Sequence, residues 1–231
     1  MDVPDAVRLL ERDLRAIFGQ RLRSLVTYRA VANGNRTAAP TLAIVNGLTA
    51  EDLRACASRV AAWRDTGLRA PLLLAVEEFE HSLDTFPLEF GAILASYRVV
   101  AGPDPFEGLQ VDPAHHRRAC ERQARSHLLH LREGYLETEG RGDAIADLIV
   151  DSAAPLAGIV EGLARLRGLE VRGTDAVRET ESVLGLGSGA IGDIVGLIGG
   201  PPPSADRARE LFPRYLNAIE RLTRYLDGWT P

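Results

Sequence analysis

Lysine is absent from this sequence of 231 residues, so all 27 basic side chains are arginine. This absence excludes chemistry that depends on a lysine amine, such as Schiff-base formation or phosphate binding by the lysine of a P-loop. Cysteine is also scarce. Cys56 and Cys120 stand alone without metal-type spacing, and we expect two buried thiols in a reducing compartment.

Long apolar runs and an excess of basic charge are missing as well. No run of about eighteen uncharged apolar residues occurs, so we expect no membrane partner. The first residues, from Met1 to Asp5, are acidic where a signal peptide needs a basic segment, which predicts a cytoplasmic protein. With 32 acidic residues the net charge is −5, so nucleic acid is not an expected partner. The remaining composition, 45% hydrophobic and 26% charged, is typical of a globular chain long enough for two domains.

The first 110 residues predict a mixed β-sheet with helices packed on it. Apolar residues at helical spacing predict one helix over 6–18 and another, capped by Thr49, that continues to Thr66. Residues 77–82 predict a short helical turn. The expected strands are Leu22–Tyr28, Thr41–Val45, Pro71–Val76 and Thr85–Phe90, with a last apolar piece at Val99–Ala101.

Strand signals end near Pro113, and the rest of the chain predicts helices joined by short connections. Pro213 is expected to kink or split the last of them, and the third is expected to break near Gly185–Gly189. The expected helices are Ala114–Glu139, Asp143–Arg167, Asp175–Ile198 and a final one from the cap Ser204 to Asp227. Glycine and proline cluster over residues 102–113, which predicts a boundary there. The fold class is therefore α+β, with a mixed-sheet domain over 1–110 and an all-α antiparallel helical bundle over 111–231.

The segments Leu25–Ala32 and Phe86–Phe90, within this order of elements, resemble the nucleotidyltransferase superfamily. More narrowly, they are similar to bacterial nucleotidyltransferase-like proteins that join a small catalytic-type domain to a helical bundle. In that family the first strand ends in Gly-Ser, the second carries Asp-x-Asp, and a later strand carries a third carboxylate. The resemblance implies a site in which the carboxylates hold two divalent metals that align attack on the α-phosphorus of a nucleotide.

The residues that carry this chemistry in the family differ in this sequence. Arg29 and Ala30 occupy the Gly and Ser positions, and Pro40–Leu42 stands where the two carboxylates belong. Glu89 matches the third carboxylate. We therefore expect a catalytically inactive relative with a nucleotide-binding, anion-binding or scaffolding role and no cofactor. Two alternatives stay open: an active enzyme that uses Mg²⁺ and an unrecognised set of carboxylates, and a purely structural interaction protein.

Six residues are candidate ligand contacts: Arg29, Ala30, Glu89, Arg118, Arg122 and Arg125. Arg29 would replace the charge of a metal ion and hold a nucleotide or another phosphate-bearing small molecule through its planar donor fork. The three arginines at 118, 122 and 125 share one face of a helix and would bind an anion. The alternative for each of these side chains is solvation, with helix partners such as Glu121 for the arginines.

Three further patterns carry less specific signals. Arg122-x4-His127 and Arg125-x4-His130 match the loose motif of a helical ribonuclease family, which arises easily in a helix rich in arginine and histidine. His127 and His130 lack an evident third metal ligand. The Gly187–Gly192 segment satisfies GxGxxG, but no strand precedes it, so we expect a helix break rather than a dinucleotide site. The apolar helix 175–198 leaves a face to cover, so a homodimer is expected.

Overall fold

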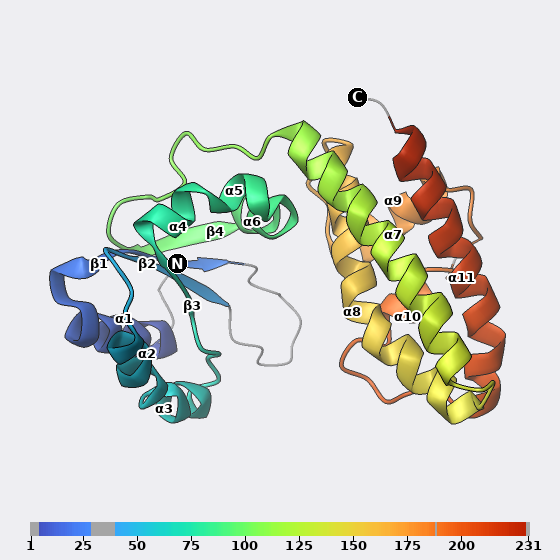
Figure 1. Ribbon diagram of the computed structural model, residues 1–231, viewed down its shortest axis with the longest axis horizontal. Helices are drawn as coiled ribbons and strands as arrows, with labels where there is room; N and C mark the ends of the chain where they lie inside the picture. Colours follow the sequence, from blue (N-terminus) through green and yellow to red (C-terminus); the bar gives the residue numbers. More distant parts are fainter. Residues whose placement is uncertain (1–4, 29–39, 188, 230–231) are drawn as a thin grey trace. The chain divides into compact units, whose positions relative to one another are not determined.

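The computed structural model describes residues 5–28, 40–187 and 189–229 (Figure 1). The chain forms two compact units, Met1–Val111 and Asp112–Pro231. The first contains a mixed sheet and the second is entirely helical within its described residues, which confirms the α+β fold class.

The first unit is built on a four-stranded sheet in the order β3-β2-β1-β4. β1 (Leu22–Tyr28) pairs antiparallel with β2 (Thr41–Val45) and with β4 (Tyr97–Ala101), whereas β3 (Leu72–Ala75) runs parallel to β2. All five residues of β2 are buried, because the strand is central and helices cover both faces of the sheet. β1 and β2 have the bounds that the sequence predicts.

Two groups of helices cover the two faces of this sheet (Figure 1). Leu25, Ala43 and Val45 pack on the first group, around the buried ring of Trp63. Val26, Leu42 and Ile44 pack on the second, with the edge-to-face aromatic rings of Phe79 and Phe106. The first group is α1 (Asp5–Phe18), the 3₁₀ turn Gly19–Arg21, α2 (Ala50–Ala57) and α3 (Val60–Asp65), and the second is α4 (Val76–Glu80), α5 (Ser82–Thr85) and α6 (Pro87–Leu94).

Two sequence expectations for this unit are wrong. The strand expected at Thr85–Phe90 is helical, because Pro87 takes the first position of α6, where its missing N–H costs nothing, and the apolar run continues to Leu94. The single helix expected from Thr49 to Thr66 is interrupted between α2 and α3, although Thr49 caps α2 as expected through its side-chain bond from the Asp52 N–H.

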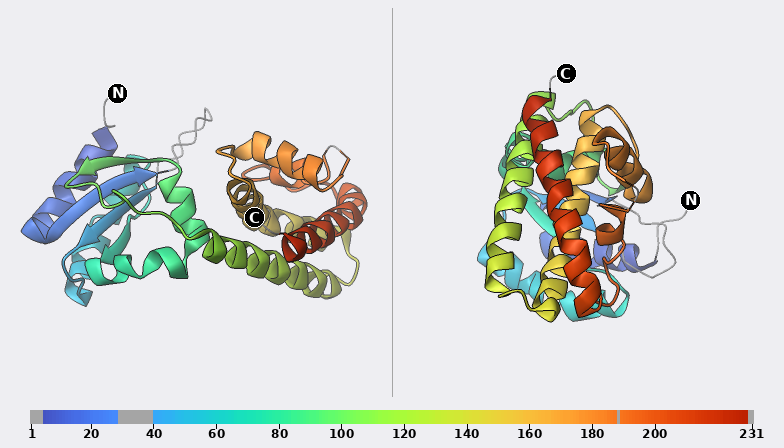
Figure 2. Two further views of the ribbon diagram at one scale, coloured as in Figure 1. Left: turned by 90° about the horizontal axis from the view of Figure 1, so that it is seen from above. Right: turned by 90° about the vertical axis from the view of Figure 1, so that its right-hand side faces the viewer.

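The second unit is a bundle in which α7, α8 and α11 run side by side and α9 packs on α8 (Figure 2). Its core is apolar, with Cys120 and Leu131 from α7, Ile149 and Leu156 from α8, and Leu222 from α11 among its fully buried side chains. Pro213 lies inside α11 without splitting it. The helices are α7 (Pro113–Glu137), α8 (Gly142–Leu166), α9 (Gly173–Val183), α10 (Gly192–Val195) and α11 (Ala205–Gly228).

Each unit buries one cysteine, Cys56 on the inner face of α2 in the first and Cys120 of α7 inside the bundle in the second. Burial raises the pKa of both thiols, to about 12 for Cys120. Within the described part of the chain, no helix combines the length and apolar character that crossing a membrane requires.

Candidate functional site

The sheet contains no acidic residue on any of its strands. β1, β2, β3 and β4 read LRSLVTY, TLAIV, LLLA and YRVVA, and the sequence has neither Asp nor Glu between Asp13 and Glu51. Among the residues that the structure describes, no group of three His, Cys, Asp or Glu side chains is arranged to hold a metal ion. Thr41, at the start of β2, has a buried hydroxyl without a hydrogen-bond partner in the described residues. An uncharged hydroxyl therefore stands where the resemblance places a carboxylate cage.

The three expected ligand contacts in the first unit do not come together in what the structure describes. Arg29 and Ala30 lie outside the described residues. Glu89 is not on a strand: it is exposed in the first turn of α6. An acid at this position is favourable for the helix dipole, which gives Glu89 a local stabilising role that needs no ligand.

The three arginines expected to form one face of α7 have different neighbours. Arg125 pairs with Glu121 on its own helix, at 3.2 Å, and with Asp227 of α11, at 2.8 Å. Arg122 instead lines a groove between α7 and α8, and no ion-pair partner for it lies in the described part of the protein. Arg118 is exposed one turn earlier, outside that groove. The three side chains therefore do not form one anion-binding surface.

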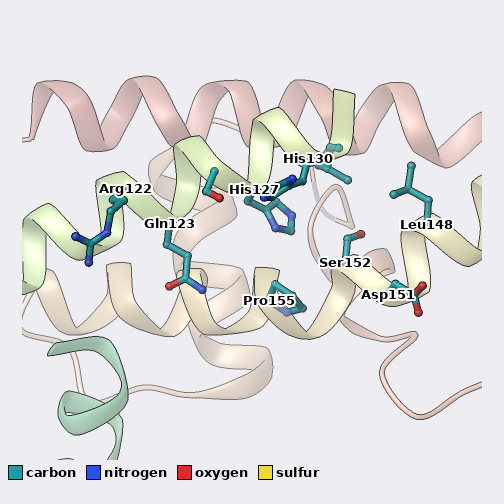
Figure 3. Close-up of a pocket in the computed structure, with 10 residues that line it drawn as sticks. Arg122, Gln123, His127, His130, Leu148, Asp151, Ser152 and Pro155 are labelled. Carbon is teal, nitrogen blue, oxygen red and sulfur yellow. The ribbon is translucent and has the colours of Figure 1, made fainter. Parts of the chain in front are cut away.

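A groove of about 520 Å³ lies between α7 and α8 (Figure 3). Leu131, Leu148 and Pro155 give it an apolar lining. Its polar lining residues come from both helices: Arg122, Gln123, Ser126, His127 and His130 from α7, and Asp151 and Ser152 from α8.

His127 is tied into a buried hydrogen-bonded chain that links the three main helices. Its Nε2 lies 2.6 Å from the Tyr215 hydroxyl of α11, which lies 3.1 Å from the Ser152 hydroxyl of α8. Ser152 donates its single proton to the carbonyl oxygen of Ile149, at 2.9 Å. Tyr215 therefore joins the imidazole of α7 to the hydroxyl of α8.

The ionisation of these groups follows from their burial. Burial, with a smaller contribution from the neighbouring His130, lowers the pKa of His127 from 6.5 to about 4. Burial raises the pKa of Tyr215 above its usual value. Both side chains are therefore uncharged at neutral pH.

The α8 side of the groove carries one acidic side chain. The Asp151 carboxylate is exposed at the groove and has no ion-pair partner in the described residues. Pro155, one turn further along α8, adds an apolar ring to the lining and has no N–H to give to the carbonyl four residues earlier. One carboxylate is thus available beside the cavity.

The Arg-x4-His motifs are only partly brought together. Arg122 and His127 line the same groove, whereas Arg125 turns to α11, and His130 is exposed with Glu133 at 3.5 Å from its Nδ1. The sequence reasoning missed the link from His127 to Tyr215. The helical spacing could have indicated that His127 is buried. The buried residues of α7 follow one another at steps of four, four, three and four, so two histidines belong to its buried stripe: His116, Cys120, Ala124, His127 and Leu131.

The glycine-rich segment has a structural explanation. The buried carboxylate of Glu181 accepts hydrogen bonds from the N–H groups of Gly189, Ile191 and Gly192, at 3.2, 2.7 and 2.9 Å. Helix α9 ends at Val183, so this loop folds back over the last turn of α9. The glycines serve a tight turn around an acid rather than the cradle of a phosphate.

Comparison with known proteins finds a solved structure with a similar fold. No protein-family model and no curated protein sequence matches the chain. Among solved structures, the chain is similar to a crystal structure of the spectinomycin adenyltransferase AAD(9) from Enterococcus faecialis with ATP and spectinomycin. The match has 12% sequence identity and a TM-score of 0.56, and it covers 95% of this chain and 100% of the other. At this identity the likeness shows a nucleotidyltransferase-like fold and nothing finer.

Proposed function

We propose that this protein is a non-catalytic member of the nucleotidyltransferase-like fold that binds a nucleotide or another phosphate-bearing small molecule. The observation that supports it is the complete lack of acids on the sheet and between Asp13 and Glu51, within a fold similar to that of an adenyltransferase. Two-metal phosphoryl transfer needs carboxylates to fix its cations. Without them the metal-dependent step has no residues to support it.

A binding role is supported by the charge of the same segment. Five arginines lie between Asp13 and Glu51, and Arg29 stands at the position of the family glycine. A guanidinium offers a planar fork of donors that matches phosphate oxygens and carries the positive charge that a metal would otherwise supply. We therefore assign to Arg29 the role of phosphate contact in a site that works without a divalent cation.

Calorimetric titration of the full chain with ATP, GTP, CTP and UTP, with and without MgCl₂, tests this proposal. We expect one nucleotide to bind with an affinity that does not require Mg²⁺. Arg29→Ala should weaken this binding by about tenfold, the effect of losing one charge-assisted contact. Arg54→Ala is the matched control, because Arg54 is an exposed arginine of α2, which follows the opposite end of β2, and it should leave the affinity unchanged. Equal affinities of the wild type and Arg29→Ala, or no binding of any nucleotide, would contradict the proposal.

A transfer assay separates the proposal from its alternatives. ATP with spectinomycin, the pair in the crystal structure of the similar protein, is the first combination to test, with Mg²⁺ and Mn²⁺. We expect no release of pyrophosphate. Turnover that Glu89→Ala abolishes would establish an active enzyme with an unrecognised carboxylate set. Absence of both turnover and nucleotide binding would favour a purely structural role.

A further inference from the structure

The α7–α8 groove has an electrical polarity that neither the fold nor the proposed nucleotide site explains. Figure 3 shows Arg122 and Asp151 toward opposite ends of the groove, with Gln123, His127 and Ser152 between them. The guanidinium of Arg122 and the carboxylate of Asp151 form no ion pair with each other or with other described residues. The groove therefore holds one open positive charge and one open negative charge.

The neutral groups strengthen this polarity. Next to Arg122, the amide of Gln123 adds N–H donors at the positive end. At the negative end, the Ser152 hydroxyl adjoins the Asp151 carboxylate in the lining. His127 between the two ends is 8% exposed and is held through Nε2 by Tyr215, so it forms part of the packed wall of the groove.

The separation of the two ends sets the size of a ligand. Arg122 precedes His127 by five residues, which corresponds to about 7.5 Å of rise along the helix. Ser152 lies across from His127, because Tyr215 joins the two side chains, and Asp151 adjoins Ser152. A ligand that touches both ends must span several bonds between its charged groups, and the cavity of about 520 Å³ is large enough for such a molecule.

We propose that the α7–α8 groove binds a small zwitterion, with its carboxylate or phosphate on Arg122 and Gln123 and its ammonium group on the carboxylate of Asp151. Each end of such a molecule meets complementary hydrogen-bonding groups, and no charge at either end of the groove is left without a partner. A pure anion would leave Asp151 unpaired and facing its negative charge, and a pure cation would do the same to Arg122. The site lies wholly in the second unit and is independent of Arg29.

A length series of ω-amino acids measures the site directly. The full chain, labelled with ¹³C-histidine, is titrated with 3-aminopropanoate, 4-aminobutanoate, 6-aminohexanoate and 8-aminooctanoate, and the ring signal of His127 is followed by NMR. We expect binding with a maximum within the series. Hexanoate and hexylamine each lack one charged end and should bind about tenfold or more weakly than 6-aminohexanoate. Aminoalkyl phosphates of matching lengths distinguish a phosphate from a carboxylate as the preferred acid.

Variants assign the two ends of the ligand. Arg122→Gln and Asp151→Asn change exposed side chains and should leave the fold intact, which their melting temperatures check. Each should weaken the binding of 6-aminohexanoate by about tenfold. Arg122→Gln should change the affinity for hexylamine, which has no acid group, much less, and Asp151→Asn should change the affinity for hexanoate, which has no ammonium group, much less. Arg118→Gln, one helical turn away and outside the groove, is the matched control and should bind as the wild type does. If no amino acid of the series shifts the His127 signal, or if both groove variants bind unchanged, the proposal is wrong.

Discussion

Replacement of His127 by glutamine should change how the stability of the bundle depends on pH. Glutamine does not titrate, and its amide N–H can still donate to the Tyr215 hydroxyl. In the folded wild type the pKa of His127 is about 4, against 6.5 for an exposed histidine. The neutral ring therefore contributes its full stability above pH 6.5, and this contribution is lost as the pH falls from 6.5 toward 4, because the unfolded chain binds the proton first.

The expected size of the effect follows from that difference in pKa. Each unit of pKa corresponds to about 1.4 kcal/mol, so the free energy of unfolding of the wild type should fall by about 3 kcal/mol more than that of His127→Gln between pH 7 and pH 4. His130 and Asp151 line the same groove as His127, and Tyr215 bonds to its ring; after burial, His130 is the group that depresses the pKa of His127.

Urea denaturation followed by circular dichroism at several pH values measures this effect. Hydrogen exchange of the α7 and α8 amides identifies the transition that belongs to the bundle. His130→Gln is the control: His130 is 76% exposed, so this variant should keep most of the pH dependence of the wild type. Parallel pH profiles of the wild type and His127→Gln, or an NMR titration of the His127 ring centred near pH 6.5, would refute the reasoning.

Three further predictions concern single contacts, each measured by chemical denaturation. Asp52→Asn should remove an acid-dependent part of the stability: the Arg21 guanidinium holds the pKa of Asp52 well below its usual 3.8, so its contribution is complete above that value and is lost as the pH falls below it. Glu181→Ala should destabilise the bundle by about 3 kcal/mol, at roughly 1 kcal/mol for each of three hydrogen bonds, whereas Glu181→Gln keeps the oxygen that accepts two of them and should lose about a third as much. Gly102→Ala should lower the free energy of unfolding by more than about 3 kcal/mol, because at a φ of +78° the new Cβ would clash with the carbonyl oxygen of Arg23. Gly108→Ala has a similar φ of +74° but open space around the Cβ, so only backbone strain should lower its free energy of unfolding, by about 1 kcal/mol.

The three predictions are open to contradiction in different ways. The prediction for Asp52→Asn is contradicted if the free energy of unfolding of this variant falls with decreasing pH as steeply as that of the wild type. For Glu181, equal losses in the alanine and glutamine variants would mean that the side chain matters only through packing. Similar stabilities of the two glycine variants would show that the contact with Arg23, rather than the backbone angle, has been overestimated.

The central strands could be predicted because their residues leave little choice. Leu22–Tyr28 and Thr41–Val45 are short β-favouring runs, and the second is apolar throughout, as a strand buried on both faces must be. The segment around Glu89 illustrates the opposite case. Its alternation of apolar and acidic residues fits a strand, but Pro87 and the continuing apolar run to Leu94 fit a helix equally well, and only packing against the sheet decides between them.

Only some residues of the candidate groove could be predicted from the sequence. Arg122 was expected to bind an anion, and His127 was noticed as part of a motif, but Tyr215 lies 88 residues from His127 and shares no local pattern with it. Asp151 and Pro155 of α8 line the same groove, but no motif in the sequence singles them out. Contacts that join distant helices depend on the register of the bundle, which periodicity alone does not determine.

The two buried cysteines make it possible to measure the opening of each unit separately, by the rate at which its thiol reacts. A thiol that is shut away from water reacts with a disulfide reagent only when the structure around it opens. Cys56 belongs to one unit and Cys120 to the other. The two labelling rates of the unmodified protein would therefore report how often each unit opens. A change in one rate after a substitution in the other unit would show that the stabilities of the two units are coupled.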